Sequence, residues 1–373
     1  MSRINYVRVI EMRRLFAGMA AALLAAVLFF PVSATSAESY VLMDAQTGRI
    51  LEHRAADKRA LIASTTKIMT ALVICEQCNV LDRVRIPSEA VGVEGSSIYL
   101  IPGEVLTVQE LLYGMMLHSG NDAATALAIY CGGTVEGFAE LMNDKARELG
   151  LNNTHFVNPH GLDAPDHYST AEDLAKLSAY AMQNPIFEKT VSSKTVNISG
   201  RSLRNHNKLL WQVDGADGVK TGYTRAAGRI LVSSAVQDSR RLICVTINDP
   251  NDWKDHKVLL ENGFSKYTVC QIIGRGQVIS KVDVAGGELG TVDLIASDDF
   301  CYSLAENECA VVIPPPNEFV YAPVVEGGFA GYASICLDGK TVCRIPLEYG
   351  NTIEQAKPEK VPFWKRIWKG DLS

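Results

Sequence analysis

The sequence predicts an α/β (α+β) domain, in which a sheet packs against helices, followed by a small all-β domain. Two short β-like segments, 39–43 and 49–53, lead directly into an apolar helical stretch, a pattern that suggests a sheet covered by helices. Alternating segments return at 216–247 and indicate antiparallel strands. From residue 274 onward, short β segments separated by glycine and proline turns are typical of an all-β fold.

The N-terminus reads as a secretory signal peptide over residues 1–37. An apolar run at 15–30 is followed by small residues at 33–37, and four arginines precede it: Arg3, Arg8, Arg13 and Arg14. We expect cleavage after Ala37 or after Ala34. An uncleaved membrane anchor is the alternative, but the run is slightly short for a span. The sequence therefore predicts an exported protein.

The composition argues against a nucleic-acid partner but does not decide which cysteines form disulfides. The net charge of −6 and the absence of a broad basic stripe argue against a nucleic-acid partner. Cys75 and Cys78 form a C-x-x-C without a second pair at zinc spacing, so we interpret them, with Cys131 and Cys244, as small core residues. The nine cysteines leave at least one unpaired, and pairing within the C-terminal group stays open: Cys301, Cys309, Cys336 and Cys343.

A serine and a lysine open the first apolar helical run. Ser64 and Lys67 are three residues apart, so on a helix they lie one turn apart on the same face. A serine hydroxyl needs an adjacent base to become a nucleophile, and the lysine amine is close enough to take its proton. The helix N-terminus also suits a developing oxyanion. A capping serine followed by an exposed lysine is the alternative for this pair alone.

A second polar motif, Ser119-Gly120-Asn121, lies between two apolar helical segments. Ser119 continues the i, i+3, i+4, i+7 spacing of a buried face formed by Leu112, Met115 and Met116, which places it in the interior. Buried polar side chains need partners. The alternative is a helix junction in which glycine stops one helix and asparagine caps the next.

The segment 153–169 is rich in Asn, Pro, Gly, Asp and His and is predicted to be an ordered loop. Its histidines, His155, His160 and His167, lack helical metal-binding spacing and a supporting glutamate, so we expect no metal. Thr170 is predicted to cap the next helix, with Asp173 in a capping-box position.

A third motif, Lys220-Thr221-Gly222-Tyr223, falls in a predicted strand. Gly222 indicates a bulge or the close approach of another backbone. Lys220 and Thr221 supply a cation and a hydroxyl, which suit an extended peptide with a terminal carboxylate docking at a sheet edge. A glycine-containing hairpin with an incidental lysine is the alternative.

The C-terminal part shows no evident catalytic group, and we interpret the β-rich segment 274–357 as a spacer or docking platform. The tail, 358–373, is predicted to form an amphipathic helix lying on anionic lipid. Its aromatic and aliphatic side chains share one helical face and its cations lie elsewhere: Phe363, Trp364, Ile367 and Trp368, against Lys365, Arg366 and Lys369.

Together, S-x-x-K, S-x-N and K-T-G form a set shared by penicillin-binding proteins and class A β-lactamases. The chain closely resembles the low-molecular-mass penicillin-binding proteins that act as serine-type D-alanyl-D-alanine carboxypeptidases of peptidase family S11. The resemblance runs from about Ser39 to the tail and includes the stretches 63–70, 118–124, 158–162 and 217–224. Ile62 replaces the proline usual before Ala-Ser in this family, which affects the entry to the helix.

The resemblance implies a penicillin-recognising fold over 38–273, with a five-stranded antiparallel sheet flanked by helices. It implies that Ser64 attacks the carbonyl between two terminal D-alanines, that Lys67 acts as a neutral base, and that Ser119 passes a proton to the leaving amine. Backbone N–H groups of Ser64 and Tyr223 would form the oxyanion hole. The implied substrate-binding residues are Asn121, Lys220, Thr221, Gly222 and Tyr223.

The implied partners are peptidoglycan stem peptides ending in D-Ala-D-Ala, β-lactams and, through the tail, the membrane surface; no cofactor is expected. The implied location is the outer face of the cytoplasmic membrane, in a periplasm or cell-wall space. A class A-like β-lactamase is one alternative, although a β-rich second domain and an anchor are foreign to that class. A non-enzymatic penicillin-binding sensor is another, although no transmembrane segment is evident after the signal peptide.

Overall fold

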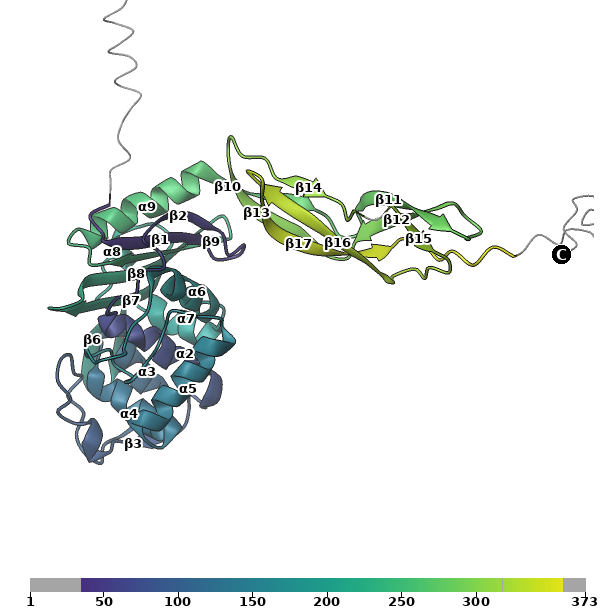
Figure 1. The fold of residues 1–373 in the computed structure, drawn as a ribbon. Helices are drawn as coiled ribbons and strands as arrows, with labels where there is room; N and C mark the ends of the chain where they lie inside the picture. The colour runs from purple at the N-terminus through teal and green to yellow at the C-terminus, as the bar shows by residue number, and fades with distance from the viewer. Residues whose placement is uncertain (1–34, 317, 358–373) are drawn as a thin grey trace, which may run out of the picture. The chain divides into compact units, whose positions relative to one another are not determined.

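The computed structural model describes residues 35–316 and 318–357 (Figure 1). This part of the chain divides into two compact units. The first comprises residues up to Val41, His53–Ser233 and Cys244–Val258; the second comprises Leu42–Glu52, Ser234–Ile243 and the residues from Leu259 onward. The predicted signal peptide and C-terminal helix fall almost wholly outside the described residues and stay predictions. Within the described ranges, no helix is long and apolar enough to cross a membrane.

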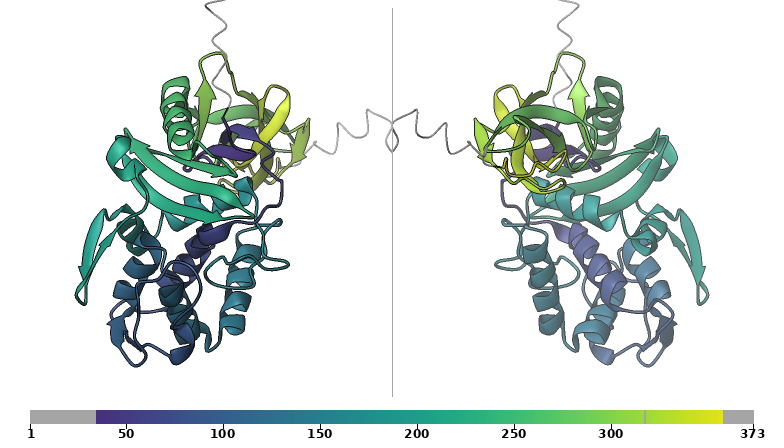
Figure 2. Two further views of the ribbon diagram at one scale, coloured as in Figure 1. Left: turned by 90° about the vertical axis from the view of Figure 1, so that its left-hand side faces the viewer. Right: turned by 90° about the vertical axis from the view of Figure 1, so that its right-hand side faces the viewer.

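A five-stranded antiparallel sheet with the order β2-β1-β9-β8-β7 forms as the sequence predicts (Figures 1 and 2). Ser233 of β8 and Thr246 of β9 accept or donate hydrogen bonds at 2.6 and 3.0 Å with His256, which anchors α9 (Asp252–Lys266) on these strands. The strands are β1 (Ser39–Asp44), β2 (Ile50–Arg54), β7 (Ala216–Thr224), β8 (Gly228–Gln237) and β9 (Arg240–Ile247).

Helices of the first unit surround α2 (Lys67–Gln77), whose residues from Lys67 to Cys75 are all buried (Figure 1). A helix that is apolar all round needs neighbours on every side. Those neighbours include α3 to α7, and the first unit also holds a short helix, α8, and two short hairpins. The bounds are α3 (Val108–Leu117), α4 (Asn121–Gly132), α5 (Val135–Glu148), α6 (Ala171–Ala181), α7 (Pro185–Ser192), α8 (Leu209–Gln212), β3 (Arg83–Arg85), β4 (Val105–Thr107), β5 (Thr195–Ile198) and β6 (Arg201–Arg204), with 3₁₀ turns η1 (Ala63–Thr66) and η2 (Ser88–Ala90).

Side-chain caps explain where two of these helices begin. Thr107 and Glu110 form a complete capping box at α3, satisfying two backbone N–H groups that the helix leaves free. Thr170 caps α6 as predicted, accepting from the Asp173 backbone N–H at 3.0 Å. The Asp173 carboxylate, however, accepts from the Asn153 N–H and the Thr154 hydroxyl, so it fastens the loop 153–169 to the helix start.

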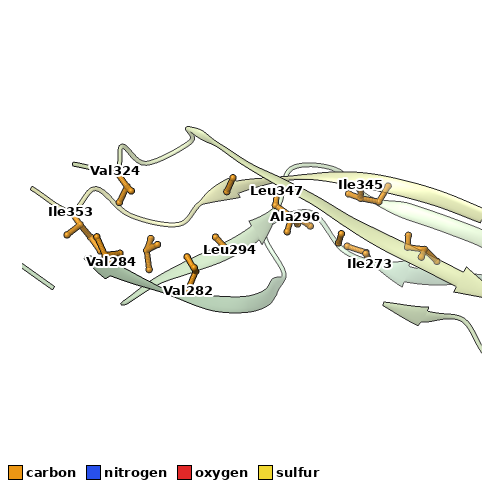
Figure 3. Packing of buried hydrophobic residues seen from close by; sticks show 13 residues of the cluster. Ile273, Val282, Val284, Leu294, Ala296, Val324, Ile345, Leu347 and Ile353 are labelled. Atoms are coloured by element: carbon orange, nitrogen blue, oxygen red, sulfur yellow. The ribbon is translucent and has the colours of Figure 1, made fainter. Parts of the chain in front are cut away.

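The C-terminal part of the second unit is β-rich, as predicted. A six-stranded sheet with the order β14-β16-β17-β12-β11-β15 encloses an apolar core that includes Val282, Leu294 and Leu347 (Figure 3). β10 pairs antiparallel with β13 in a separate ribbon. The bounds are β10 (Tyr267–Ile273), β11 (Val278–Ala285), β12 (Thr291–Ala296), β13 (Phe300–Ala305), β14 (Val311–Ile313), β15 (Phe319–Tyr321), β16 (Phe329–Leu337) and β17 (Lys340–Tyr349).

Two cysteine assignments were wrong. Cys75 and Cys244 are buried as predicted, but Cys78 and Cys131 are only half-buried. The apolar helical pattern suggested a deeper position than they have, because both lie where their helices end and the packed interior gives way to the surface. The structure contains no disulfide bond among the nine cysteines, all of which lie in the described residues.

Candidate active site

Ser64 lies in the 3₁₀ turn η1, immediately before α2, and it is half-buried. The prediction of a helix start is correct in spacing, but the serine precedes the α-helix rather than forming its first turn. The alternative of an ordinary capping serine is not seen, since no side-chain cap is made at either helix start. Ala63, with φ +45°, occupies the left-handed region that L-residues avoid, a strain typical of functional turns.

Lys67 is fully buried, and its Nζ has three oxygen neighbours. Ser64 Oγ lies 3.1 Å away, Asn121 Oδ1 2.7 Å away and the His160 carbonyl oxygen 2.7 Å away. Burial and the nearby Lys220 cation hold the pKa of Lys67 well below its usual value of about 10.5, and Asp122 offsets this only in part. Ser64 Oγ and Lys67 Nζ are therefore within proton-transfer distance, and burial favours the uncharged amine.

Ser119 and Asn121 approach the same amine from the junction between α3 and α4. Asn121 accepts from Lys67, while its Nδ2 donates to the Glu94 carbonyl oxygen. Ser119 is 5% exposed and has φ +62°, and its Oγ has no hydrogen-bond partner among the described residues. A buried hydroxyl without a partner is costly unless a ligand supplies one. The predicted junction is thus both a helix boundary and a polar site.

The third motif lies on β7 beside Ser64. Gly222 passes so close to the η1 turn that a Cβ atom there would lie 3.2 Å from the Ile62 carbonyl oxygen and 3.3 Å from the Ser64 nitrogen, which confirms the predicted close approach. Lys220 is buried, its Nζ donates to the Thr221 carbonyl oxygen at 2.9 Å, and burial lowers its pKa to about 7. Tyr223 is 65% exposed.

Residues of all three motifs border a cavity of about 950 Å³ within the first unit. Such a volume lies in the range of small-molecule and peptide sites. The cavity lining includes residues from all three motifs and two histidines, namely Ser64, Ser119, Thr221, Gly222, His118 and His206.

Several residues that support the site were not identified from the sequence. The His160 carbonyl that holds Lys67 is a backbone group, so no residue type could reveal it. Asp122 accepts from the N–H groups of Ile98 and Leu100, each at 3.1 Å, and thereby fixes the loop that follows Ser96. Its place directly after Asn121 was the available signal. His118 and His206, with ring centroids 4.8 Å apart, were also missed.

The histidines of the loop 153–169 have structural contacts. His167 Nε2 lies 2.8 Å from the Thr66 hydroxyl, and its Nδ1 accepts from the Val157 N–H. His155 Nδ1 lies 2.7 Å from the Asp166 carbonyl oxygen. No group of three or more His, Cys, Asp or Glu side chains in residues 35–316 and 318–357 is arranged to hold a metal ion.

Comparison with known proteins fits this geometry. A family model described as D-alanyl-D-alanine carboxypeptidase, Peptidase S11, matches residues 29–251. The chain belongs to this family. A second model, the C-terminal domain of penicillin-binding protein 5, matches residues 267–355. The penicillin-recognising fold, the family and the serine carboxypeptidase class predicted from the sequence are therefore confirmed.

Relatives within this carboxypeptidase family cover most of the chain. D-alanyl-D-alanine carboxypeptidase DacF of Bacillus subtilis is 32% identical over 87% of this chain and 87% of its own length. DacC of Escherichia coli is 33% identical over 89% of this chain and 86% of its own. The crystal structure of penicillin-binding protein 5 from Haemophilus influenzae superposes with a TM-score of 0.76, at 32% identity, covering 86% of this chain and 98% of that one.

Proposed function

We propose that this carboxypeptidase removes the terminal D-alanine from peptidoglycan stem peptides through an acyl-enzyme on Ser64, with Lys67 as the base. The observation that carries the proposal is the set of three contacts around Lys67 Nζ. A neutral amine has two hydrogens and one lone pair. Donation to Asn121 Oδ1 and to the His160 carbonyl uses both hydrogens, which leaves the lone pair for the Ser64 hydroxyl hydrogen.

Lys220 and Thr221 are proposed to bind the terminal carboxylate of the peptide. Their motif borders the same cavity as Ser64, and an extended peptide can pair with the edge of β7. A carboxylate near the buried Lys220 would favour its protonated form and so raise its pKa above the value of about 7 found without ligand. Binding of the carboxylate would then stabilise the positive charge on Lys220, and that charge would in turn strengthen the binding.

Ser119 is proposed to pass the proton from Lys67 to the leaving amine. Its unpartnered hydroxyl faces the cavity that holds Ser64, so a substrate nitrogen can supply the missing partner. Once that proton has left, Lys67 is neutral again and can take a proton from the water that releases the acyl group. The backbone N–H groups of Ser64 and Tyr223 would hold the oxyanion, at a typical gain of about 10²–10³ in rate per donor.

Intact-mass measurement tests this function. In separate reactions, the purified chain is mixed with penicillin or with a diacyl-D-Ala-D-Ala peptide, and both the protein mass and free D-alanine are followed. We expect a stable penicilloyl adduct on Ser64 and release of D-alanine with a transient acyl-enzyme. Ser64→Ala should abolish both, whereas Ser88→Ala, which removes an exposed hydroxyl, should change neither.

The same experiment separates the alternatives. Rapid turnover of penicillin without a lasting adduct would indicate a class A-like β-lactamase. A lasting adduct without any D-alanine release would indicate a binding-only sensor. D-alanine release at the parental rate by Ser64→Ala would refute the proposed mechanism.

We further propose that the chain is exported and works at the outer face of the cytoplasmic membrane. Support comes from the signal-like residues 1–37, from the amphipathic pattern of 358–373 and from the family. We retain 38–273 as the peptidase domain and 274–357 as the β-rich domain that separates it from the lipid. Deleting residues 361–373 should release the protein from membrane pellets, and persistent pelleting would refute the anchor.

A further inference from the structure

Two half-buried thiols, Cys78 and Cys131, lie at the ends of two helices that both begin in the active site. Cys78 is the C-cap residue of α2, and Cys131 is the residue before the last in α4. At their other ends, Lys67 of α2 and Asn121 of α4 are joined by a hydrogen bond of 2.7 Å. The cysteines therefore lie where the two catalytic helices meet away from the cavity.

Contacts on both sides of Cys78 hold it near Cys131. The Cys131 thiol lies 3.8 Å from Gln77 Oε1, and the hydroxyl of Tyr130 donates to Asp82 Oδ2 at 2.9 Å. The two thiols also interact electrostatically, and this interaction lowers the pKa of Cys131 and, together with burial, raises that of Cys78. The Cys131 thiol is thus the more readily ionised member of the pair.

We propose that Cys78 and Cys131 are the site of a disulfide bond that forms after the chain reaches an oxidising compartment. The oxidant is a small-molecule or protein disulfide, such as glutathione disulfide. The Cys131 thiolate attacks one sulfur and expels the first glutathione thiolate. The Cys78 sulfur then attacks Cys131 Sγ, expels the second glutathione thiolate and gives up its proton. Two protein thiols are oxidised, one disulfide is reduced, and the two protons end on the two released thiols.

Other cysteines in the chain have different surroundings. Cys75 is 8% exposed, and burial raises its pKa to about 12, so its reactive thiolate form is suppressed. The thiols of Cys270, Cys309 and Cys343 donate to backbone carbonyl oxygens within two residues of themselves. The pairing of Cys78 with Cys131 follows from contact between two elements instead.

The bond would connect the far ends of α2 and α4, whose near ends already meet at Lys67 and Asn121. Closing the loop from residue 78 to residue 131 removes conformational freedom from the unfolded chain. We therefore expect the oxidised first unit to unfold at a higher temperature, with a shift on the order of 5–10 °C.

Peptide mapping of the full-length protein tests the proposal. The protein is incubated with glutathione disulfide, quenched in acid, alkylated and digested without reductant by a protease that cuts after glutamate. Cleavage after Glu76 separates Cys75 from Cys78, so the proposed bond joins peptide 77–89 to peptide 111–136. We expect this linked pair, at a mass two hydrogens below the sum of its parts, and its loss on reduction.

Variants supply the controls. Cys75→Ser should retain the linked peptides, whereas Cys131→Ser should lose them and melt at the temperature of the reduced parent. Alkylated, unlinked Cys78 and Cys131 in the oxidised parent would overturn the proposal, as would a bond from Cys75 or a stable glutathione adduct on Cys131. The mapping uses the parent chain, so it remains decisive even where a variant folds poorly.

Discussion

Lys67 is the buried amine that we propose as the base for Ser64, and only its neutral form can take a proton. Its full burial and the Lys220 charge both disfavour the ammonium form, while the Asp122 carboxylate favours it. The three oxygens around Nζ would also satisfy an ammonium group, so hydrogen bonding alone does not decide the charge. Burial of Lys67 and the charge of Lys220 therefore favour the neutral amine.

Replacing Lys67 by methionine keeps a long side chain in the buried site but removes the base. We expect the rate of Ser64 acylation by penicillin to fall by about 10²–10⁴, the usual contribution of a general base. Stopped-flow acylation rates, with the melting temperature as a check on folding, measure this. A rate within threefold of the parent would exclude Lys67 as the base.

The proposed role of Lys220 in carboxylate binding predicts an alkaline limit for the reaction. Lys220 can bind a carboxylate only as a cation, and this protonated form is present below its pKa of about 7 and lost as the pH rises through that value. We expect kcat/KM for a peptide with a free C-terminus to fall by up to about tenfold per pH unit above pH 7. The same peptide with a C-terminal amide should be a poorer substrate, and its kcat/KM should not show this fall above pH 7. A flat profile to pH 10 for the free acid would contradict this role for Lys220.

At the scale of elements, the position of Ser64 depends on a backbone contact between the η1 turn and the loop 153–169. Gly161 has φ +89°, and a Cβ atom there would overlap the Ala63 carbonyl group. The preceding residue, His160, supplies the carbonyl that holds Lys67. Gly161 therefore lets the loop reach both the η1 turn that carries Ser64 and the Lys67 amine.

Gly161→Ala should displace this turn and slow acylation by about 10²-fold, the cost of roughly 1 Å of misplacement. Gly150→Ala is the matched control, because Gly150 also has a positive φ (+66°) but an added Cβ would meet nothing within 4 Å. The control should lose only about 1–2 kcal/mol of stability and keep its acylation rate. Equal acylation rates in the two variants would show that the contact is irrelevant to catalysis.

The elements also show what the sequence could reveal. Side-chain spacing predicted the Ser64 helix, the Ser119 junction and the β7 strand. Each of them carries either a local pattern of apolar residues or a short motif. The β10 and β13 strands were not assigned individually from the sequence, because their half-exposed residues alternate weakly. The His160 carbonyl and the Gly161 contact join segments far apart in the chain, which no local pattern encodes.

Across the whole molecule, buried histidines make the fold sensitive to acid. His256 of α9 is fully buried against β8 and β9, and burial lowers its pKa to about 3. His167 is 2% exposed, and burial, with a smaller effect of His155, lowers its pKa to about 4. Both are neutral when the chain is folded, whereas in the unfolded chain they take up protons near pH 6.5.

The free energy of unfolding should therefore be highest above pH 6.5 and should fall as the pH drops toward 4, since the unfolded state binds more protons there. Between pH 6.5 and pH 5, each of the two histidines accounts for up to about 2 kcal/mol. Urea titrations at pH 7, 6 and 5 measure the loss. His256→Gln keeps a donor and an acceptor for Ser233 and Thr246 but cannot titrate, so its stability should fall less steeply with acid. The same slope in parent and variant would show that His256 does not cause the acid sensitivity.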